Sequence, residues 1–119
     1  MSQRMERVSG EIREVIGEMM ARSAIKDPRV RGAGIITITH VRVTGDLRQA
    51  RVFFTVHGAD EEFLNRVRSG LQSAAGFMRR QVGERLRLKV TPELAFEPDT
   101  MLEKEAHIEQ LLREVAKKE

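Results

Sequence analysis

The feature that most restricts the fold of this chain is a long amphipathic stretch with a glycine in its middle. Apolar residues recur at helical spacing from Phe63 to Val82, and Gly76 interrupts them. Glycine inside a helix costs roughly 1 kcal/mol relative to alanine. We therefore expect two helices that meet at a corner, the second beginning with free N–H groups beside Arg79 and Arg80, which suits a phosphate. The alternative is a glycine that only lets helices pack closely.

Apolar periodicity before this stretch predicts one helix and a β-hairpin. Residues 3–23 carry apolar side chains every third or fourth position, which predicts a helix with Ser2 as its N-cap. Residues 35–43 and 50–57 alternate around the turn at 44–47 and predict two antiparallel strands. The apolar phase changes inside the first strand, so we expect a β-bulge near Thr39 or His40. Asp60 should cap the helix that follows the hairpin.

The last part of the chain predicts a third strand and a final helix. Apolar residues occupy every second position from Leu86 to Phe96, with Pro92 at a bulge or an unpaired edge. A helix follows Pro98 and Asp99. The predicted order is α-β-β-α-kink-α-β with an appended helix, an α+β domain of two layers. We assign residues 1–98 to this single domain and residues 99–119 to an acidic amphipathic helix appended to it.

Charge is distributed unevenly along the chain. Residues 1–92 hold 17 Lys and Arg against 10 Asp and Glu, a balance of +7, whereas residues 93–119 hold 4 against 8, a balance of −4. A basic body predicts a polyanionic partner, and an ordinary solvated surface is the alternative. Residues 79–89 alone carry a balance of +4 and could neutralise several phosphates.

The sequence shows no arrangement of residues that is typical of a catalytic or cofactor-binding site. The chain has no cysteine, and its three histidines have no ligand-like spacing, so we expect no enzyme, cofactor or metal. No apolar run approaches membrane-spanning length, and we expect a cytoplasmic protein. There is no Trp or Tyr, and Phe53 and Phe77 are the only aromatic side chains outside the apolar phases, so base stacking should be weak.

Several segments, in this order and spacing over essentially the whole chain, resemble the bacterial ribosome-binding factor A family. Ala74-Ala75-Gly76 is similar to the kink that replaces, in that family, the GxxG loop of type II KH domains. The other resembling segments are Ile25-Lys-Asp-Pro-Arg29, Val43-Thr-Gly-Asp-Leu47, Ala50-Arg-Val52, Gly76-Phe-Met-Arg79, and Pro92-Glu-Leu94 with Phe96.

The resemblance implies a KH-like (type II) domain that binds the free or immature 30S small ribosomal subunit. Such factors assist late 16S rRNA maturation and 30S assembly without catalysis and are linked to growth in the cold. A GTPase partner promotes release in the family, although no residue here indicates it. The alternatives are a generic KH-like module that binds single-stranded RNA in another pathway and a protein-interaction adaptor. Neither a membrane nor a small-molecule substrate is expected, and a monomer is the default.

The expected RNA-binding residues come from two arguments. The resemblance places Ala74, Ala75 and Gly76 with Arg79 and Arg80 at an RNA-facing corner. Charge adds cations from the predicted third strand, the first helix and the loop after that helix, namely Arg87, Lys89, Arg4, Arg7, Lys26 and Arg29.

Overall fold

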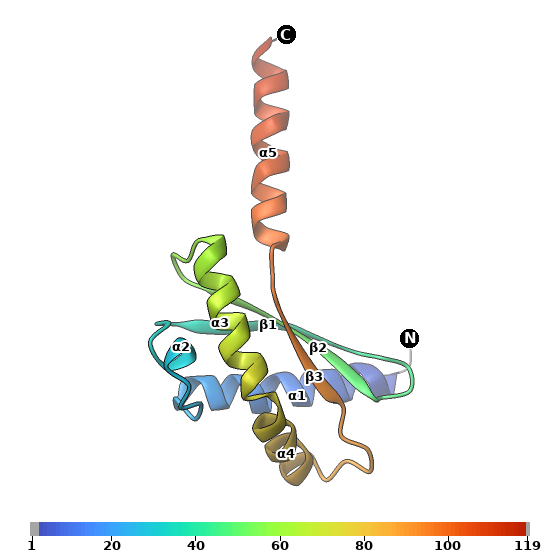
Figure 1. Ribbon diagram of the computed structural model, residues 1–119. Helices are drawn as coiled ribbons and strands as arrows, with labels where there is room; N and C mark the ends of the chain where they lie inside the picture. The colour runs from blue at the N-terminus through green and yellow to red at the C-terminus, as the bar shows by residue number, and fades with distance from the viewer. Residues whose placement is uncertain (1–2, 119) are drawn as a thin grey trace.

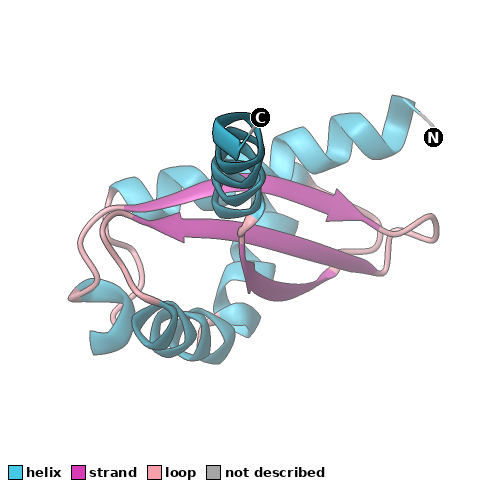
Figure 2. Ribbon diagram, turned by 90° about the horizontal axis from the view of Figure 1, so that it is seen from above, coloured by secondary structure: helices cyan, strands magenta, loops and turns pink. Residues whose placement is uncertain are grey.

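A three-stranded sheet with helices packed on one face forms the body of the protein (Figures 1 and 2). The computed structural model describes residues 3–118, with the side chains of residues 3–100 and 108–116. Its elements are α1 (Gln3–Ala21), α2 (Pro28–Arg31), β1 (Ile36–Val43), β2 (Gln49–Val56), α3 (Glu61–Ser73), α4 (Ala75–Leu86), β3 (Glu93–Pro98) and α5 (Met101–Lys118). The predicted two-layer α+β architecture is confirmed.

Helix α1 forms because its apolar residues fall on one face. Val8, Ile12, Val15, Ile16 and Met19 are buried there against the sheet and α4. The helix ends at Ala21, two residues before the predicted end. Ser2, the expected N-cap, lies outside the described residues.

Strands β1 and β2 form the predicted antiparallel hairpin, and the predicted bulge is present. Ile38 pairs with Phe54 and His40 pairs with Phe53, so Thr39 has no partner of its own in the ladder. The extra residue lets Ile38 and Val41 both face the core, where each is buried.

Helix α2 is a single turn that the sequence reading missed. Asp27 accepts a hydrogen bond from the backbone N–H of Arg29, and Pro28 occupies the first helical position. Proline suits that position because its missing N–H would have no partner in the first turn anyway. The Asp27-Pro28 pair therefore begins a short helix in the segment after α1.

The third strand differs from the prediction at both ends. It runs parallel to β2 from Glu93 to Pro98, with Gln49 opposite Glu93. The residues at 86, 88 and 90 alternate like a strand, but α4 continues to Leu86 and Arg87 ends it in the left-handed conformation, with φ at 51°. Residues 87–92 form a loop. Pro92 precedes the strand, so no bulge is needed, and Glu93 donates the first bond to the carbonyl oxygen of Arg48.

Helix α5 follows β3, as predicted, but extends away from the body (Figure 1). The part of its apolar stripe that the structure describes is not buried. Ile108, Leu111, Leu112 and Val115 are 47–64% exposed. The core lies instead between the sheet and helices α1, α3 and α4, where Phe54 and Phe96 are its largest side chains.

Candidate nucleic-acid interface

The bend between α3 and α4 lies at Ala74, two residues before Gly76, so the predicted break at the glycine is wrong. The N–H of Ala74 donates to the carbonyl oxygens of Gly70 and Leu71, at 3.3 and 3.0 Å, which tightens the last turn of α3. Gly76 is the second residue of α4. The bend arises because α3 packs on β3 and α2 while α4 packs on α1 and β3. Packing therefore decides where the helix breaks.

Gly76 is not a packing glycine. Within the described part of the chain, a Cβ placed there would have no atom within 4 Å apart from its chain neighbours and the adjacent backbone of α4, and this contradicts the close-packing alternative. Close packing occurs at two other glycines. A Cβ on Gly83 would lie 2.7 Å from Thr91 Oγ1, and a Cβ on Gly70 would meet α2. Gly76 thus leaves open space on the surface of α4.

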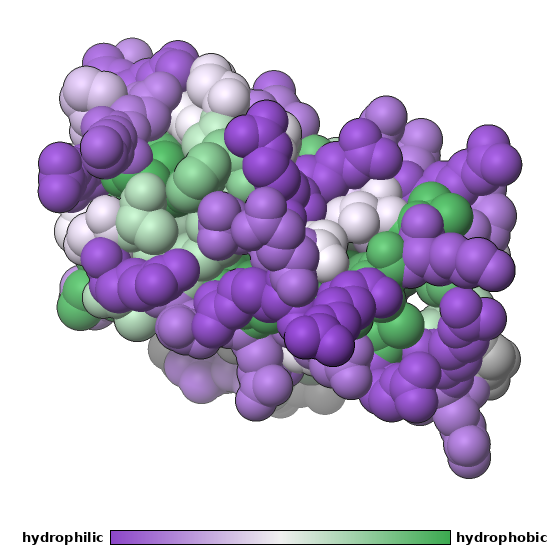
Figure 3. All heavy atoms as spheres, turned by 90° about the horizontal axis from the view of Figure 1, so that it is seen from below, coloured by the Kyte–Doolittle hydropathy of each residue, from purple (hydrophilic) through white to green (hydrophobic). Residues whose placement is uncertain are grey.

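That open space belongs to a shallow groove of about 770 Å³ between α4 and the loop at residues 87–92. We call it the basic groove. Its lining residues are Gly76, Arg79, Arg80, Gly83, Glu84, Leu88, Lys89, Val90 and Thr91. The face of the molecule seen from below, the side on which α4 lies, is largely hydrophilic with apolar side chains reaching the surface between the polar ones (Figure 3).

Arg79 and Arg80 are both exposed, but they have different roles. Arg79 donates from Nε and Nη2 to the carbonyl oxygen of Thr91, at 3.0 and 2.9 Å, and so ties α4 to the loop. Arg80 and Lys89 have no hydrogen-bond or ion-pair partner among the residues described. These two side chains are the cations of the groove that are available for phosphate oxygens.

Replacing Arg79 with alanine should loosen the loop at residues 87–92 and lower the free energy of unfolding by about 0.5–1.5 kcal/mol, because two hydrogen bonds are lost at an exposed site. Hydrogen exchange of the loop amides measures the effect. Arg79→Lys is the matched control, because lysine keeps the positive charge but lacks the planar guanidinium that donates twice to the Thr91 carbonyl oxygen. If the two hydrogen bonds order the loop, Arg79→Lys should also loosen it. Wild-type exchange rates in Arg79→Ala would show that the tether does not order the loop.

Arg29 supports the bend from the α2 side. Its guanidinium donates to both carboxylate oxygens of Asp27, at 3.0 and 2.8 Å, and to Ser73 Oγ at 3.1 Å. These side-chain bonds, with the Arg29 backbone N–H, lower the pKa of Asp27 to about 2. Arg29 thus links α2 to the last residue of α3. Its side chain remains 41% exposed beside the bend.

The other predicted cations do not join the lining of the basic groove. Arg87 caps α4, so it does not lie on a strand as predicted, and Lys26 is exposed before α2. Helix α4 is tied to α1 by the 2.7 Å ion pair between Arg85 and Glu18. Arg4 and Arg7 lie about 15–20 Å farther along α1 from that pair, because a helix rises 1.5 Å per residue.

The sequence does not predict five of the lining residues, namely Gly83, Glu84, Leu88, Val90 and Thr91. The alternation from Leu86 to Phe96 predicts that Val90 lies on the apolar face of a strand, yet its side chain is 53% exposed in the loop. No sequence signal pairs Gly83 with Thr91, because that contact depends on how the loop returns toward α4.

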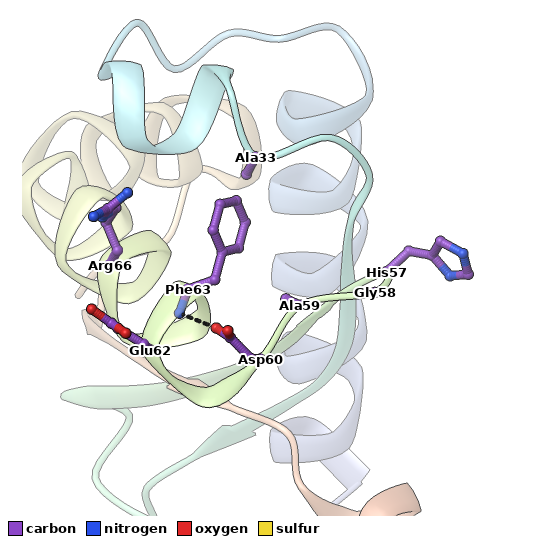
Figure 4. Close-up of a pocket in the computed structure, with 8 residues that line it drawn as sticks. All are labelled: Ala33, His57, Gly58, Ala59, Asp60, Glu62, Phe63 and Arg66. Carbon is purple, nitrogen blue, oxygen red and sulfur yellow. Dashed lines mark hydrogen bonds between the residues drawn. The ribbon is translucent and has the colours of Figure 1, made fainter.

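A second hollow, of about 440 Å³, lies at the start of α3 (Figure 4). Asp60 caps this helix as predicted, accepting from the N–H of Phe63 at 2.8 Å. The ring of Phe63 points toward Ala33, and His57 points out of the hollow. The lining mixes the charges of Asp60, Glu62 and Arg66, so it favours no anion. Among the described residues, no group of three or more His, Asp or Glu could hold a metal ion.

The α-β-β-α-α-β order, with a bend between two helices and a basic groove beside it, defines a KH-like domain of type II. The family model described as Ribosome-binding factor A matches residues 4–112. A ribosome-binding factor A of Geobacter sp. (strain M21) is 44% identical over 115 residues, which cover 97% of this chain and 92% of the relative. The chain belongs to the ribosome-binding factor A family.

Solved structures agree on the fold. The crystal structure of ribosome-binding factor A from Thermus thermophilus superposes with a TM-score of 0.61 at 21% identity, over 79% of this chain and 94% of that one. A homology model of the Thermus thermophilus factor, fitted into a cryo-electron microscopy map of a complex of 30S with the factor, superposes with a TM-score of 0.60 at 22% identity, over 76% of this chain and 90% of that one. None of the helices among the described residues could span a membrane.

Proposed function

We propose that this protein binds the 30S small ribosomal subunit through RNA contacts at the basic groove. The observation that carries the proposal is a pair of cations beside the open surface at Gly76, Arg80 and Lys89, which have no partner among the residues that the structure describes. Guanidinium and ammonium groups on an open surface can neutralise phosphates. Membership of the family and the 30S complex of the Thermus thermophilus factor support the choice of partner.

The role that fits such binding is assistance to late 16S rRNA maturation and 30S assembly in the cytoplasm, without covalent chemistry. Release by an assembly GTPase is part of the proposal and rests on the family resemblance. The phosphate contacts fix where the protein lies on the RNA and carry no sequence information by themselves. Shape and neighbouring contacts must therefore select the site on the particle.

Sedimentation through a sucrose gradient tests the proposal. Tagged protein added to a bacterial lysate should migrate with free small subunits at low salt, be absent from joined ribosomes, and leave the subunits at high salt. The protein should leave the subunits at high salt because its cations displace counterions from the phosphates when they bind, and added salt opposes this displacement. Protein that stays at the top of the gradient under both conditions would contradict the proposal.

Gly76→Ala should separate stability from binding. The residue is helical and an added methyl group would meet no other segment of the described chain, so the free energy of unfolding should rise by up to about 1 kcal/mol. The same methyl group projects toward the surface where an RNA backbone would approach, so binding to small subunits should weaken. Thermal unfolding and a binding titration measure the two effects.

Gly17→Ala in α1 is the matched control for Gly76→Ala, since a Cβ there also meets nothing within the described chain. It should raise stability and leave binding unchanged. Equal binding by Gly76→Ala and the wild type would remove Gly76 from the contact surface.

A further inference from the structure

Exposed apolar side chains lie in the basic groove and next to one of its lining residues, and phosphate binding does not explain them. Outside α5, the described residues include three exposed large apolar side chains: Ile35 at 72%, Val90 at 53% and Phe77 at 44%. Val90 lines the groove, and Phe77 follows Gly76, which also lines it. Apolar groups that are exposed in or next to a binding surface indicate a partner with apolar faces of its own.

Phe77 is exposed because of its position on α4. The residue after it, Met78, and Val82 one turn later are fully buried and hold the helix against the core. Successive helical residues are separated by about 100° around the axis, so Phe77 lies to the side of this buried stripe. Met78 and Val82, not Phe77, therefore supply the main contacts of this part of α4 with the core.

The position of Phe77 brings an aromatic ring and a cation together. Helical side chains lean toward the N-terminus of their helix, so Phe77 leans toward the turn that begins at the bend. Arg80 is three residues later and is its neighbour on the helix surface. A ring beside a guanidinium matches the two parts of a nucleotide, because the base has an apolar face and the phosphate is an anion.

We infer that the corner of α4 binds an unpaired RNA nucleotide, with its base stacked on Phe77 and its phosphate held by Arg80. This inference rests on the proposed function and names the kind of RNA that the basic groove takes. The outside of an RNA duplex offers phosphates and riboses but no free base face. An exposed phenylalanine at this place therefore favours a single-stranded segment or a bulge.

Fluorescence of a single-stranded hexanucleotide RNA with 2-aminopurine at its centre tests the stacking. The full-length protein at low salt should quench the fluorescence, since stacking on an aromatic ring quenches that base. Phe77→Ala should lose the quenching and bind at least about tenfold more weakly. The salt slope should stay as in the wild type, because no charge is removed. Phe77→Tyr keeps a ring and should retain both properties.

Ile35→Ala is the matched control, since Ile35 is also exposed but lies just before β1, outside α4 and the lining of the basic groove. It should leave quenching and affinity unchanged, and the thermal unfolding of both variants should match the wild type. Undiminished quenching by Phe77→Ala would overturn the inference. A second result would also overturn it: the wild type binds small subunits but not the RNA, and Phe77→Ala no longer binds the subunits. The ring of Phe77 would then contact a ribosomal protein instead of a base. If the wild type binds no small subunits, the proposed function fails first.

Discussion

Gly70→Ala is expected to destabilise the protein by about 1–3 kcal/mol, the usual cost of forcing a methyl group into a packed contact. A Cβ on Gly70 would lie 3.0 Å from Arg29 Cβ, 3.0 Å from Val30 Cγ2 and 3.2 Å from Asp27 Oδ1. All three atoms belong to α2 and its cap, and Val30 is buried. To make room for the added methyl group, α2 would therefore have to move away from α3.

Urea denaturation measures the loss as a lower midpoint. Gly10→Ala in α1 is the control, because it adds the same methyl group to a helix where the described residues leave open space. That variant should be neutral or more stable by up to about 1 kcal/mol. A Gly70→Ala midpoint equal to that of Gly10→Ala would show that α2 accommodates the methyl group.

Arg80→Ala combined with Lys89→Ala is expected to reduce affinity for small subunits on the order of tenfold at low salt. The salt slope should fall by roughly two units, one for each lost phosphate contact. Folding should be unaffected, since both side chains are exposed and neither has a partner within the described chain. Binding titrations at several salt concentrations give both quantities.

Arg42→Ala combined with Arg48→Ala removes the same charge from the hairpin, where both side chains are exposed. Its effect on affinity and slope should be small if the groove is the contact surface. Equal losses in the two double variants would mean that the protein is attracted by its overall charge. The basic groove would then have no special role in binding.

The sequence predicts well those elements in which local pattern and packing agree. The apolar stripe of α1 and the alternation of β2 lead to the correct elements, and the phase change in β1 leads to the bulge at Thr39. Each of these patterns exists because one face of the element is buried. In these elements, the periodic apolar positions are the residues that form the core.

The errors arise where packing overrides a local signal. Glycine at position 76 weakens a helix, but the direction of α4 is set by the surfaces on which it packs, and the bend falls at Ala74. Leu86, Leu88 and Val90 alternate by coincidence, because one ends a helix and the others lie in a loop. The alternation continues from these residues into the true strand at Glu93–Pro98, so periodicity alone does not show where the strand begins.

The candidate site was predicted only in part for the same reason. Arg80 and Lys89 could be named from charge, and they line one groove. The sequence gives no indication that Arg79 is bonded to Thr91, because that bond needs the path of the loop. Arg4 and Arg7 were included for charge alone, and the length of α1 places them away from the pair that joins it to α4.

The parallel pairing of β3 with β2 has a consequence for the order of folding. Strands β1 and β2 are joined by a tight turn and can pair early, whereas β3 is separated from β2 by α3 and α4. The loop that forms one wall of the basic groove is held between α4 and β3. We therefore expect refolding protein to regain its strand signal before its RNA affinity, so that competence to bind is the last property the nascent domain acquires.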